Sequence, residues 1–318
     1  MSQKSINTVL VTGANSGLGY ESVKQLVQIH NVKKVYLACR SETKAQEAIK
    51  KLVTETGQPE STFQFIAFDS SDVQSCTAAV SAIDTPLDGV ILNAGGMMGF
   101  TGAKTIEGAN DMFAANVLGH AAFIEKAIAE GKLSPQARIV LTLVIRVGSE
   151  GSREMTAMKF KTPTYEEHTA DCLYNYVSGA TSKSANEDAW YGYVKNLGTL
   201  YISALARRHT EYHFLTISPG GTVGTAIASN AGFFKRIFFS KIAFPAMHML
   251  GKAHTVDVGA ARYLTGIIGT ELPASGTFIA TTGNAEMTGP VGDQSVLFPM
   301  FADETLQDAV YDAIHRII

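Results

Sequence analysis

The chain has 318 residues, of which 46% are hydrophobic and 17% charged, and its formal net charge is −3. Such a length can bury a full core without metals or disulfides, and the sequence has no basic stripe of the kind that nucleic-acid binders carry. The three cysteines are scattered without a CxxC pair, which disfavours a disulfide framework and a zinc site. The polar N-terminus and the absence of a long apolar run predict a cytoplasmic protein without a secretory signal or transmembrane segment.

Short β-branched runs alternate with helical patterns, which is typical of βαβ units around a parallel sheet. We expect strands at 7–11, 34–38, 63–67, 87–92, 138–147, 214–217 and 276–280. We expect helices at 17–29, 42–55, 73–83, 108–130 and 188–208, and we interpret 148–187 as an irregular excursion. The pattern predicts one α/β domain over 1–318, a Rossmann-type doubly wound parallel sheet of about seven strands with helices on both faces.

A glycine-rich turn, TGANSGLG, follows the first expected strand directly. Its first glycine permits a tight turn, the second lets the backbone approach a pyrophosphate, and the third lets the helix pack closely on the strand. The helix that follows would present unpaired N–H groups and its positive dipole end to phosphates. The turn therefore predicts a dinucleotide site made of Gly13, Asn15, Ser16, Gly17, Leu18 and Gly19.

The TGxxxGxG spacing resembles that of the short-chain dehydrogenase/reductase family, and further family motifs follow in the family's order. They are Asp69, the run Asn93-Ala94-Gly95, Asn116, the YxxxK pair Tyr191 and Lys195, and Pro219-Gly220. The resemblance spans about residues 7 to 283. It implies an NAD(P)-dependent dehydrogenase or reductase, similar to the retinol dehydrogenase and protochlorophyllide reductase branches.

The resemblance also implies contacts along the cofactor. Asn93, Ala94 and Gly95 would line the adenosine ribose and support the central strands. Pro219, Gly220 and Thr222 would border the nicotinamide, although the spacing leaves open whether Thr222 or Thr225 makes this contact. Asp69, with Ser70 beside it, would orient the adenine or else belong only to the start of the next helix.

The end of the second strand bears on the choice of cofactor. Folds that prefer NAD place a carboxylate near this point to bind the ribose 2′-hydroxyl. This sequence has Cys39 and Arg40 there, and a guanidinium suits a 2′-phosphate. Ser41 could add to the same site. We therefore expect NADP(H) in preference to NAD(H), the alternative being that Arg40 is a solvated surface residue.

Tyr191 and Lys195 lie one helical turn apart, so both can face one cleft. Carbonyl reduction needs a proton donor, and a nearby ammonium would lower the phenol pKa from its usual value near 10. By resemblance, Lys195 would also hold the nicotinamide ribose, and Asn116 would support a water-mediated proton relay. Tyr193 cannot replace Tyr191, because the residue four positions after it is Leu197.

The serine that polarises the substrate oxygen in this family is less clearly placed. Counting back from the tyrosine gives Ser178, which lies in the irregular segment. Aligning the strand from Arg138 puts Leu143 and Val144 at the serine position. Ser149 is flanked by glycine where the fifth strand breaks, and we prefer it; this choice implies a bulge or extra residues in that strand. The alternative is that no serine is placed and activity is weak or absent.

Five phenylalanines lie between 233 and 244, inside a segment that we interpret as a helical substrate lid over 222–250. They favour a lipophilic substrate, but they could equally pack the lobe on the body of the protein. Interleaved basic residues also leave open an amphipathic surface for peripheral membrane contact. Self-association into a homo-oligomer stays open, and the spacing of the histidines predicts no metal site.

Together these features predict an NADPH-dependent oxidoreductase that reduces a hydrophobic carbonyl compound or oxidises the matching alcohol. Two alternatives remain. The first is an NADP(H)-binding sensor that has lost turnover, and the second is a double-bond reductase of the protochlorophyllide type.

Overall fold

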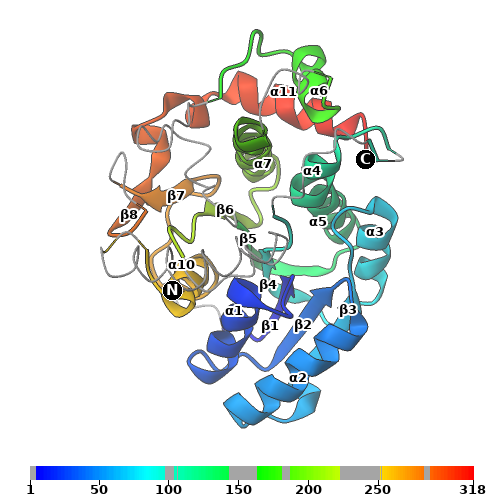
Figure 1. Cartoon of the computed structure of the whole chain (residues 1–318), viewed down its shortest axis with the longest axis vertical. Coiled ribbons are helices and arrows are strands. Elements are labelled where there is room, and N and C mark those ends of the chain that lie inside the picture. Colours follow the sequence, from blue (N-terminus) through cyan, green and yellow to red (C-terminus); the bar gives the residue numbers. More distant parts are fainter. Residues whose placement is uncertain are drawn as a thin grey trace, which may run out of the picture.

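The computed structural model describes residues 5–96, 104–105, 107–142, 163–180, 187–222, 251, 253–282 and 287–318. Within them, eight strands form one sheet in the order β3-β2-β1-β4-β5-β6-β7-β8 (Figure 1). Neighbouring strands are parallel except β7 and β8, which pair antiparallel. The order reverses between β1 and β4, where a doubly wound sheet binds its ligands. The Rossmann-type fold expected from the sequence is confirmed.

The strands are β1 (Thr8–Thr12), β2 (Lys34–Cys39), β3 (Phe63–Ala67), β4 (Leu87–Leu92), β5 (Leu133–Thr142), β6 (His213–Ile217), β7 (Phe278–Thr281) and β8 (Val291–Asp293). The helices are α1 (Gly17–Gln28), α2 (Glu42–Thr56), α3 (Val73–Ser81), α4 (Asp111–Phe113), η2 (Ala114–Leu118), α5 (Gly119–Ala129), α6 (Ala170–Val177), α7 (Glu187–Arg208), α10 (Val256–Ile268) and α11 (Glu304–His315).

Side chains that alternate along the strands build a separate core on each face of the sheet. In β1, Val9 and Val11 belong to the core shared with α1, α2 and α10, whereas Leu10 belongs to the core shared with α3, α5 and α7. Both cores are apolar because the inner strands are covered on both sides, as parallel sheets require.

The single helix expected at 108–130 is interrupted. The Asn110 side chain caps the start of α4 by accepting from the N–H groups of Met112 and Phe113. One π-helical segment, η2, then separates α4 from α5. A π-turn inserts an extra residue into a helix and is often found at functional sites.

Strand β5 begins earlier than expected, at Leu133. Its pairing with β4 changes register between Leu87 and Gly89, and Gln136 adopts a positive φ of 58° there. This irregularity lies at the start of the strand, away from the end where Ser149 follows. Residues 143–150 lie outside the described residues, so the expected extension of the strand to 147 is not placed.

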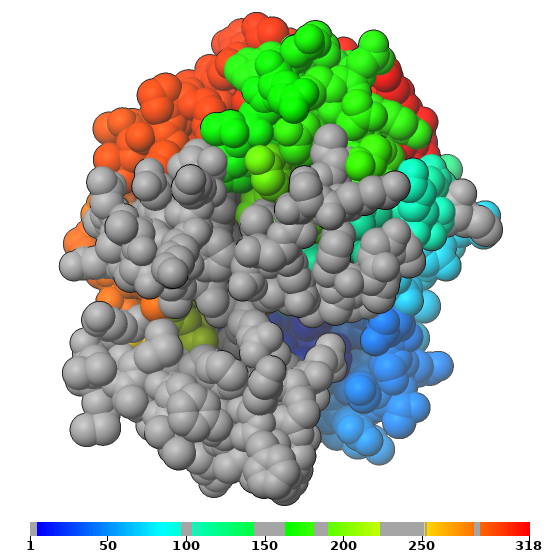
Figure 2. Space-filling view, turned by 45° about the horizontal axis from the view of Figure 1, so that its top comes forward, coloured from blue at the N-terminus to red at the C-terminus, as the bar shows by residue number. Residues whose placement is uncertain are grey.

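Besides short 3-10 turns, four elements go beyond those expected: the helices α6, α10 and α11 and the strand β8. Helix α6 lies inside the segment interpreted as irregular, with Thr169 as its N-cap, and β8 adds an eighth strand. Helix α11 packs against α6 and α7, and Figure 2 shows the α6 region (green) against the C-terminal part of the chain (red). An ion pair of 2.6 Å between Arg316 and Asp171 joins the same two regions.

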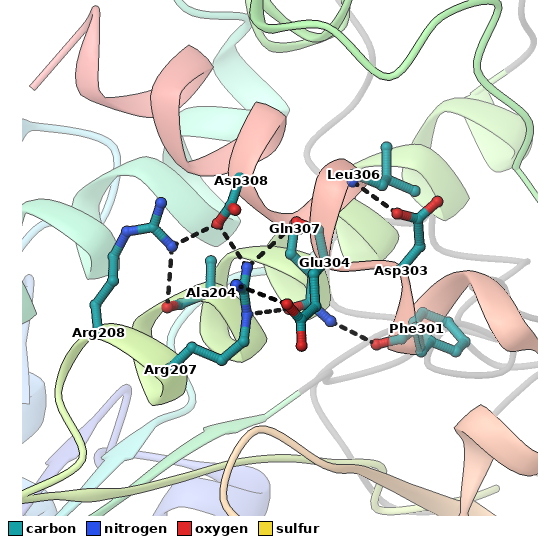
Figure 3. Close-up of polar contacts among 9 residues, drawn as sticks. All are labelled: Ala204, Arg207, Arg208, Phe301, Asp303, Glu304, Leu306, Gln307 and Asp308. Carbon is teal, nitrogen blue, oxygen red and sulfur yellow. Dashed lines mark hydrogen bonds and ion pairs between the residues drawn. The ribbon is translucent and has the colours of Figure 1, made fainter.

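Polar contacts tie α11 to the end of α7 (Figure 3). Arg207 donates from Nε to Gln307 at 2.9 Å, and Arg208 donates to Asp308 at 2.7 Å. The Arg208 guanidinium also lies 3.9 Å from the ring centroid of Tyr311. These contacts form a mixed polar and aromatic interface that orders the C-terminal helix.

Helix α11 also contacts α5. The imidazole Nε2 of His315 lies 2.9 Å from Glu125, and the Tyr201 hydroxyl of α7 donates to the same carboxylate at 2.9 Å. These partners lower the pKa of Glu125 and raise that of His315, in each case against the effect of burial. Three helices therefore meet at one carboxylate.

Among the described residues, the structure has no helix that is both long and apolar enough to cross a bilayer.

Candidate active site

The glycine-rich turn forms an open cradle at the carboxyl end of β1. Gly13 and Gly17 have positive φ angles of 65° and 56°, a conformation that favours glycine. Helix α1 starts at Gly17, and its N-cap residue, Ser16, makes no side-chain capping bond. The first N–H groups of α1 are thus not closed off by their own cap, as a phosphate site requires.

Gly19 allows α1 to pack directly on the turn and on the next strand. A Cβ atom at this position would collide with the carbonyl oxygen of Gly13 and lie 2.7 Å from Nδ2 of Asn93. The close packing predicted for the third glycine is therefore present, and it brings the turn against the Asn93 segment.

At the end of β2, Cys39 is buried and Arg40 is exposed. Burial raises the pKa of the Cys39 thiol to about 11, which keeps it neutral. Ser41 is the N-cap of α2 and accepts from the N–H of Lys44 at 3.4 Å. Arg40 lies between the end of β2 and this cap, and it is exposed.

Asp69 lies in the turn after β3. Its Oδ1 accepts from the backbone N–H of Ser71 at 3.1 Å and from the Ser71 hydroxyl at 2.7 Å. The N-cap of α3 is Asp72, so Asp69 does not cap this helix. Ser70, between them, packs with its carbonyl against Gly119 of α5. Asp69 shapes a turn at the edge of the sheet where the adenine was expected.

The segment Asn93–Gly96, which follows β4, is held at both ends. At the first end, the Thr12 hydroxyl oxygen accepts from the N–H of Asn93 at 2.8 Å and of Ala94 at 2.7 Å. At the other end, Asn116 donates from Nδ2 to the Gly96 carbonyl at 2.9 Å and accepts from its N–H at 3.0 Å. Gly95, between them, has a φ of 137°, and a Cβ there would lie 2.6 Å from Asn116 Oδ1.

Asn116 lies on the π-helical segment η2 and also contacts α7. Lys195 donates from Nζ to Asn116 Oδ1 at 2.8 Å. Lys195 is 2% exposed, and burial lowers the pKa of its ammonium to about 7. The structure thus brings together Asn116 and Lys195, which the sequence places far apart.

Tyr191 is 3% exposed and lies one turn before Lys195, whose Nζ is 5.2 Å from the centroid of the phenol ring. Burial raises the pKa of Tyr191, in contrast to the lowering that a nearby ammonium predicts. The difference has a physical reason: the ammonium lies over the ring and is bonded to Asn116, so desolvation dominates.

The residues considered for the serine position fall in different places. Ser149, Leu143 and Val144 lie outside the described residues. Ser178 is the C-cap residue of α6, and its hydroxyl donates to the Asn175 carbonyl at 3.4 Å. Ser178 therefore lies at the end of a helix and not at the end of a strand.

The turn Pro219–Thr222 follows β6 and is closely packed. Gly220 has a φ of 71°, and a Cβ there would meet the carbonyl of Met287 and the guanidinium of Arg262. The Thr222 hydroxyl is 3.3 Å from the Gly220 carbonyl and 3.2 Å from Nε2 of His254. Thr225 and the remainder of the expected lid, 223–250, lie outside the described residues.

Two buried residues at this site are not among those singled out from the sequence. Thr12 holds the start of the Asn93 segment, and His120 contacts the Thr12 hydroxyl at 3.1 Å. The threonine could have been found as the first residue of the TGxxxGxG pattern. The histidine gives a weaker signal, since it shows only as a polar residue four positions after Asn116 in an apolar helix.

Comparison with known proteins agrees with this geometry. The profile of the family described as short chain dehydrogenase matches residues 7–157. A short-chain dehydrogenase/reductase of Armillaria gallica is 30% identical over 246 residues, which is 75% of this chain and 72% of that protein. The WW domain-containing oxidoreductase of Drosophila melanogaster is 26% identical over 273 residues, and the match covers 82% of this chain but only 60% of that protein.

Solved structures share the fold. Salutaridine reductase from Papaver somniferum has a TM-score of 0.61 at 20% identity, and the match covers 86% of this chain and 99% of that one. The NADPH-bound carbonyl reductase from chicken fatty liver has a TM-score of 0.56 at 18% identity and covers 86% and 96%.

A glycine-rich turn at the switch point of a doubly wound sheet defines a dinucleotide-binding fold. The chain belongs to the short-chain dehydrogenase/reductase family, whose members use NAD(P).

The described residues fit a nicotinamide dinucleotide. The cradle admits no side chain at Gly19, and the α1 N-terminus lacks a side-chain cap. The buried Oδ1 of Asn93 has no hydrogen-bond partner among the described residues, so it can accept from a ligand. Gly13 to Gly19 would hold the phosphates, and Lys195 would lie at the reactive end.

Proposed function

We propose that this chain is an NADPH-dependent reductase of a small, hydrophobic carbonyl compound, which can also oxidise the matching alcohol. The observation that carries the proposal is the buried hydrogen bond between Lys195 and Asn116, with the lysine over the Tyr191 ring. This group lies next to the Asn93–Gly96 segment, which Asn116 also holds. A proton donor and a cofactor cradle thus share one region of the fold.

The bound cofactor would supply a hydride to the carbonyl carbon. Tyr191 would donate its phenolic proton to the carbonyl oxygen, so that the alcohol O–H forms and a phenolate remains. The Tyr191 hydroxyl is protonated at neutral pH, and because burial raises its pKa, the Lys195 ammonium over the ring would have to stabilise the phenolate that forms. Lys195, whose pKa is lowered to about 7, can return a proton to the phenolate, and Asn116 orients its ammonium.

The proposal assigns oxygen polarisation to Ser149 on sequence grounds alone, since it follows the expected strand. The hydrophobic substrate rests on the phenylalanines of the proposed lid at 222–250. Human retinol dehydrogenase 11, which is 36% identical over 135 residues (42% of this chain and 41% of that protein), is named for a lipophilic alcohol. This relative supports a substrate of similar character.

The proposal is tested by steady-state NADPH oxidation over a panel of lipophilic aldehydes, ketones and quinones. Turnover of at least one compound, with product formed in equal amount to NADPH consumed, is the expected result. Tight NADPH binding without turnover over the panel would instead identify the chain as a dinucleotide-binding sensor. Reduction of a carbon–carbon double bond would point to the protochlorophyllide-type alternative.

Replacement of Arg40 by alanine is expected to weaken NADPH binding by about tenfold or more, and NADH binding by less than twofold. The exposed guanidinium can pair with the 2′-phosphate, which NADH lacks. The measurement is fluorescence titration of both cofactors. Lys50→Ala, which removes an exposed cation further along α2, serves as the control. Equal losses for NADPH and NADH in Arg40→Ala would refute the role of Arg40.

A further inference from the structure

The hydrogen bonds of Thr12 determine which way its hydroxyl proton points. The Thr12 oxygen accepts from two backbone N–H groups, those of Asn93 at 2.8 Å and Ala94 at 2.7 Å. A hydroxyl oxygen has two acceptor sites and one proton. Both acceptor sites are filled, so the proton is left for the third neighbour, Nε2 of His120 at 3.1 Å.

The surroundings of His120 agree with this accounting. The side chain is 2% exposed and stacks on Phe68, with ring centroids 5.8 Å apart at an angle of 17°. Burial, together with the nearby charge of Lys195, lowers the pKa of His120 to about 3. The imidazole is therefore neutral. The Thr12 contacts would make Nε2 its acceptor and place the ring proton on Nδ1, which has no hydrogen-bond partner among the described residues.

His120 and Asn116 lie one turn apart where the π-helical segment passes into α5. Asn116 holds Gly96 directly, and His120 contacts the residue that holds Asn93 and Ala94. The Thr12 carbonyl also accepts from Nδ2 of Asn93 at 2.9 Å. One stretch of helix thus contacts one end of the Asn93–Gly96 segment directly, through Asn116, and the other end indirectly, through His120 and Thr12.

We propose that His120 is a positioning residue: its neutral imidazole accepts the Thr12 hydroxyl proton and thereby directs the hydroxyl oxygen to the N–H groups of Asn93 and Ala94. The effect on cofactor affinity rests on the proposed function, since this segment would line the adenosine ribose. The orientation of Thr12 itself does not depend on it.

His120→Phe keeps a ring of similar size against Phe68 but removes the acceptor. We expect the NADPH dissociation constant to rise by about tenfold. His120→Gln, which retains an acceptor at a similar reach, should stay within about threefold of wild type. In a Thr12→Val background, His120→Phe should add no further loss, because the hydroxyl is already absent.

Phe123→Leu is the matched packing control, because Phe123 also contacts Phe68, with centroids 5.7 Å apart, but bears no polar group. It should lower the melting temperature while leaving the NADPH dissociation constant unchanged. Additive losses in the double variant, or equal losses of affinity in Phe123→Leu and His120→Phe, would overturn the proposal.

Two measurements need no cofactor and separate this proposal from the proposed function. Nitrogen NMR of histidine-labelled wild-type protein should show His120 as the Nδ1–H tautomer from pH 5.5 to 8. Hydrogen exchange by mass spectrometry should show faster exchange of the Asn93–Gly96 peptide in His120→Phe than in Phe123→Leu. An Nε2–H tautomer or an imidazolium would refute the role of His120 even if NADPH binds, and the NMR result stands even if a variant fails to fold.

Discussion

Replacing Tyr191 with phenylalanine is expected to lower turnover by about 10²–10⁴-fold, the usual contribution of a positioned general acid. The substitution keeps a buried ring that is 3% exposed in the wild type and removes only the hydroxyl, so the protein should remain folded and bind NADPH normally. The measurements are kcat on the best substrate of the panel and NADPH affinity by fluorescence.

Tyr193 provides the matched control for this substitution. It lies on the same helix, but its hydroxyl donates to the Thr164 carbonyl at 3.2 Å, in the aromatic cluster that Tyr165 and Tyr176 share. Tyr193→Phe should retain most of the activity. Near-normal turnover in Tyr191→Phe, or an equal loss in both variants, would contradict the assignment of Tyr191 as the proton donor.

Lys195→Met is expected to change both catalysis and the pH dependence of stability. Removal of the ammonium deprives the phenolate of its proton source and should lower kcat by about 10²-fold or more. The buried lysine has a pKa of about 7 when folded and about 10.4 when unfolded. Between these values the unfolded state binds more protons, so the wild-type free energy of unfolding gains up to about 1.4 kcal/mol per pH unit as pH rises.

This gain should be absent in Lys195→Met, and urea denaturation at pH 7, 8 and 9 measures it. The difference in the free energy of unfolding between wild type and variant should shift in favour of wild type as pH rises. Lys126→Met, on α5, controls for the loss of a partly exposed lysine. Parallel pH profiles for wild type and Lys195→Met would show that Lys195 is not held in a desolvated position.

The sheet could be predicted from the sequence because its inner strands carry near-continuous apolar runs between turn residues. Strand β8 could not, since Val291–Asp293 has only three residues and no buried side of its own. Helix α11 was not among the expected helices, although its sequence carries a helix pattern. Asp303 suits an N-cap, and Leu306, Val310 and Ala313 follow on one side. The π-turn at η2 gives no sequence signal, because Ala114–Leu118 suits an α-helix equally well.

For the candidate site too, some features could be predicted from the sequence and others could not. Motif spacing predicted that Tyr191 and Lys195 lie on one helix face, since residues four apart do so, and both are buried on α7. It could not place Asn116 against Lys195, because that contact depends on how η2 and α7 cross above the sheet. The motif also suggested a lowered pKa for Tyr191, because the charge of Lys195 is visible in the sequence. The burial that raises this pKa is visible only in the structure. The role of Ser149 stays a prediction.

Helix α11 is linked through one carboxylate to the helices that carry the candidate site. Glu125 of α5 contacts Tyr201 of α7 and His315 of α11, and Lys195 lies on α7 while Asn116 lies on the segment that leads into α5. Loss of the Glu125 contacts is therefore expected to disturb the packing of the two helices that also meet at the 2.8 Å bond between Lys195 and Asn116. Searches for variants with altered turnover should accordingly include Glu125, Tyr201 and His315 as well as the residues of the candidate site.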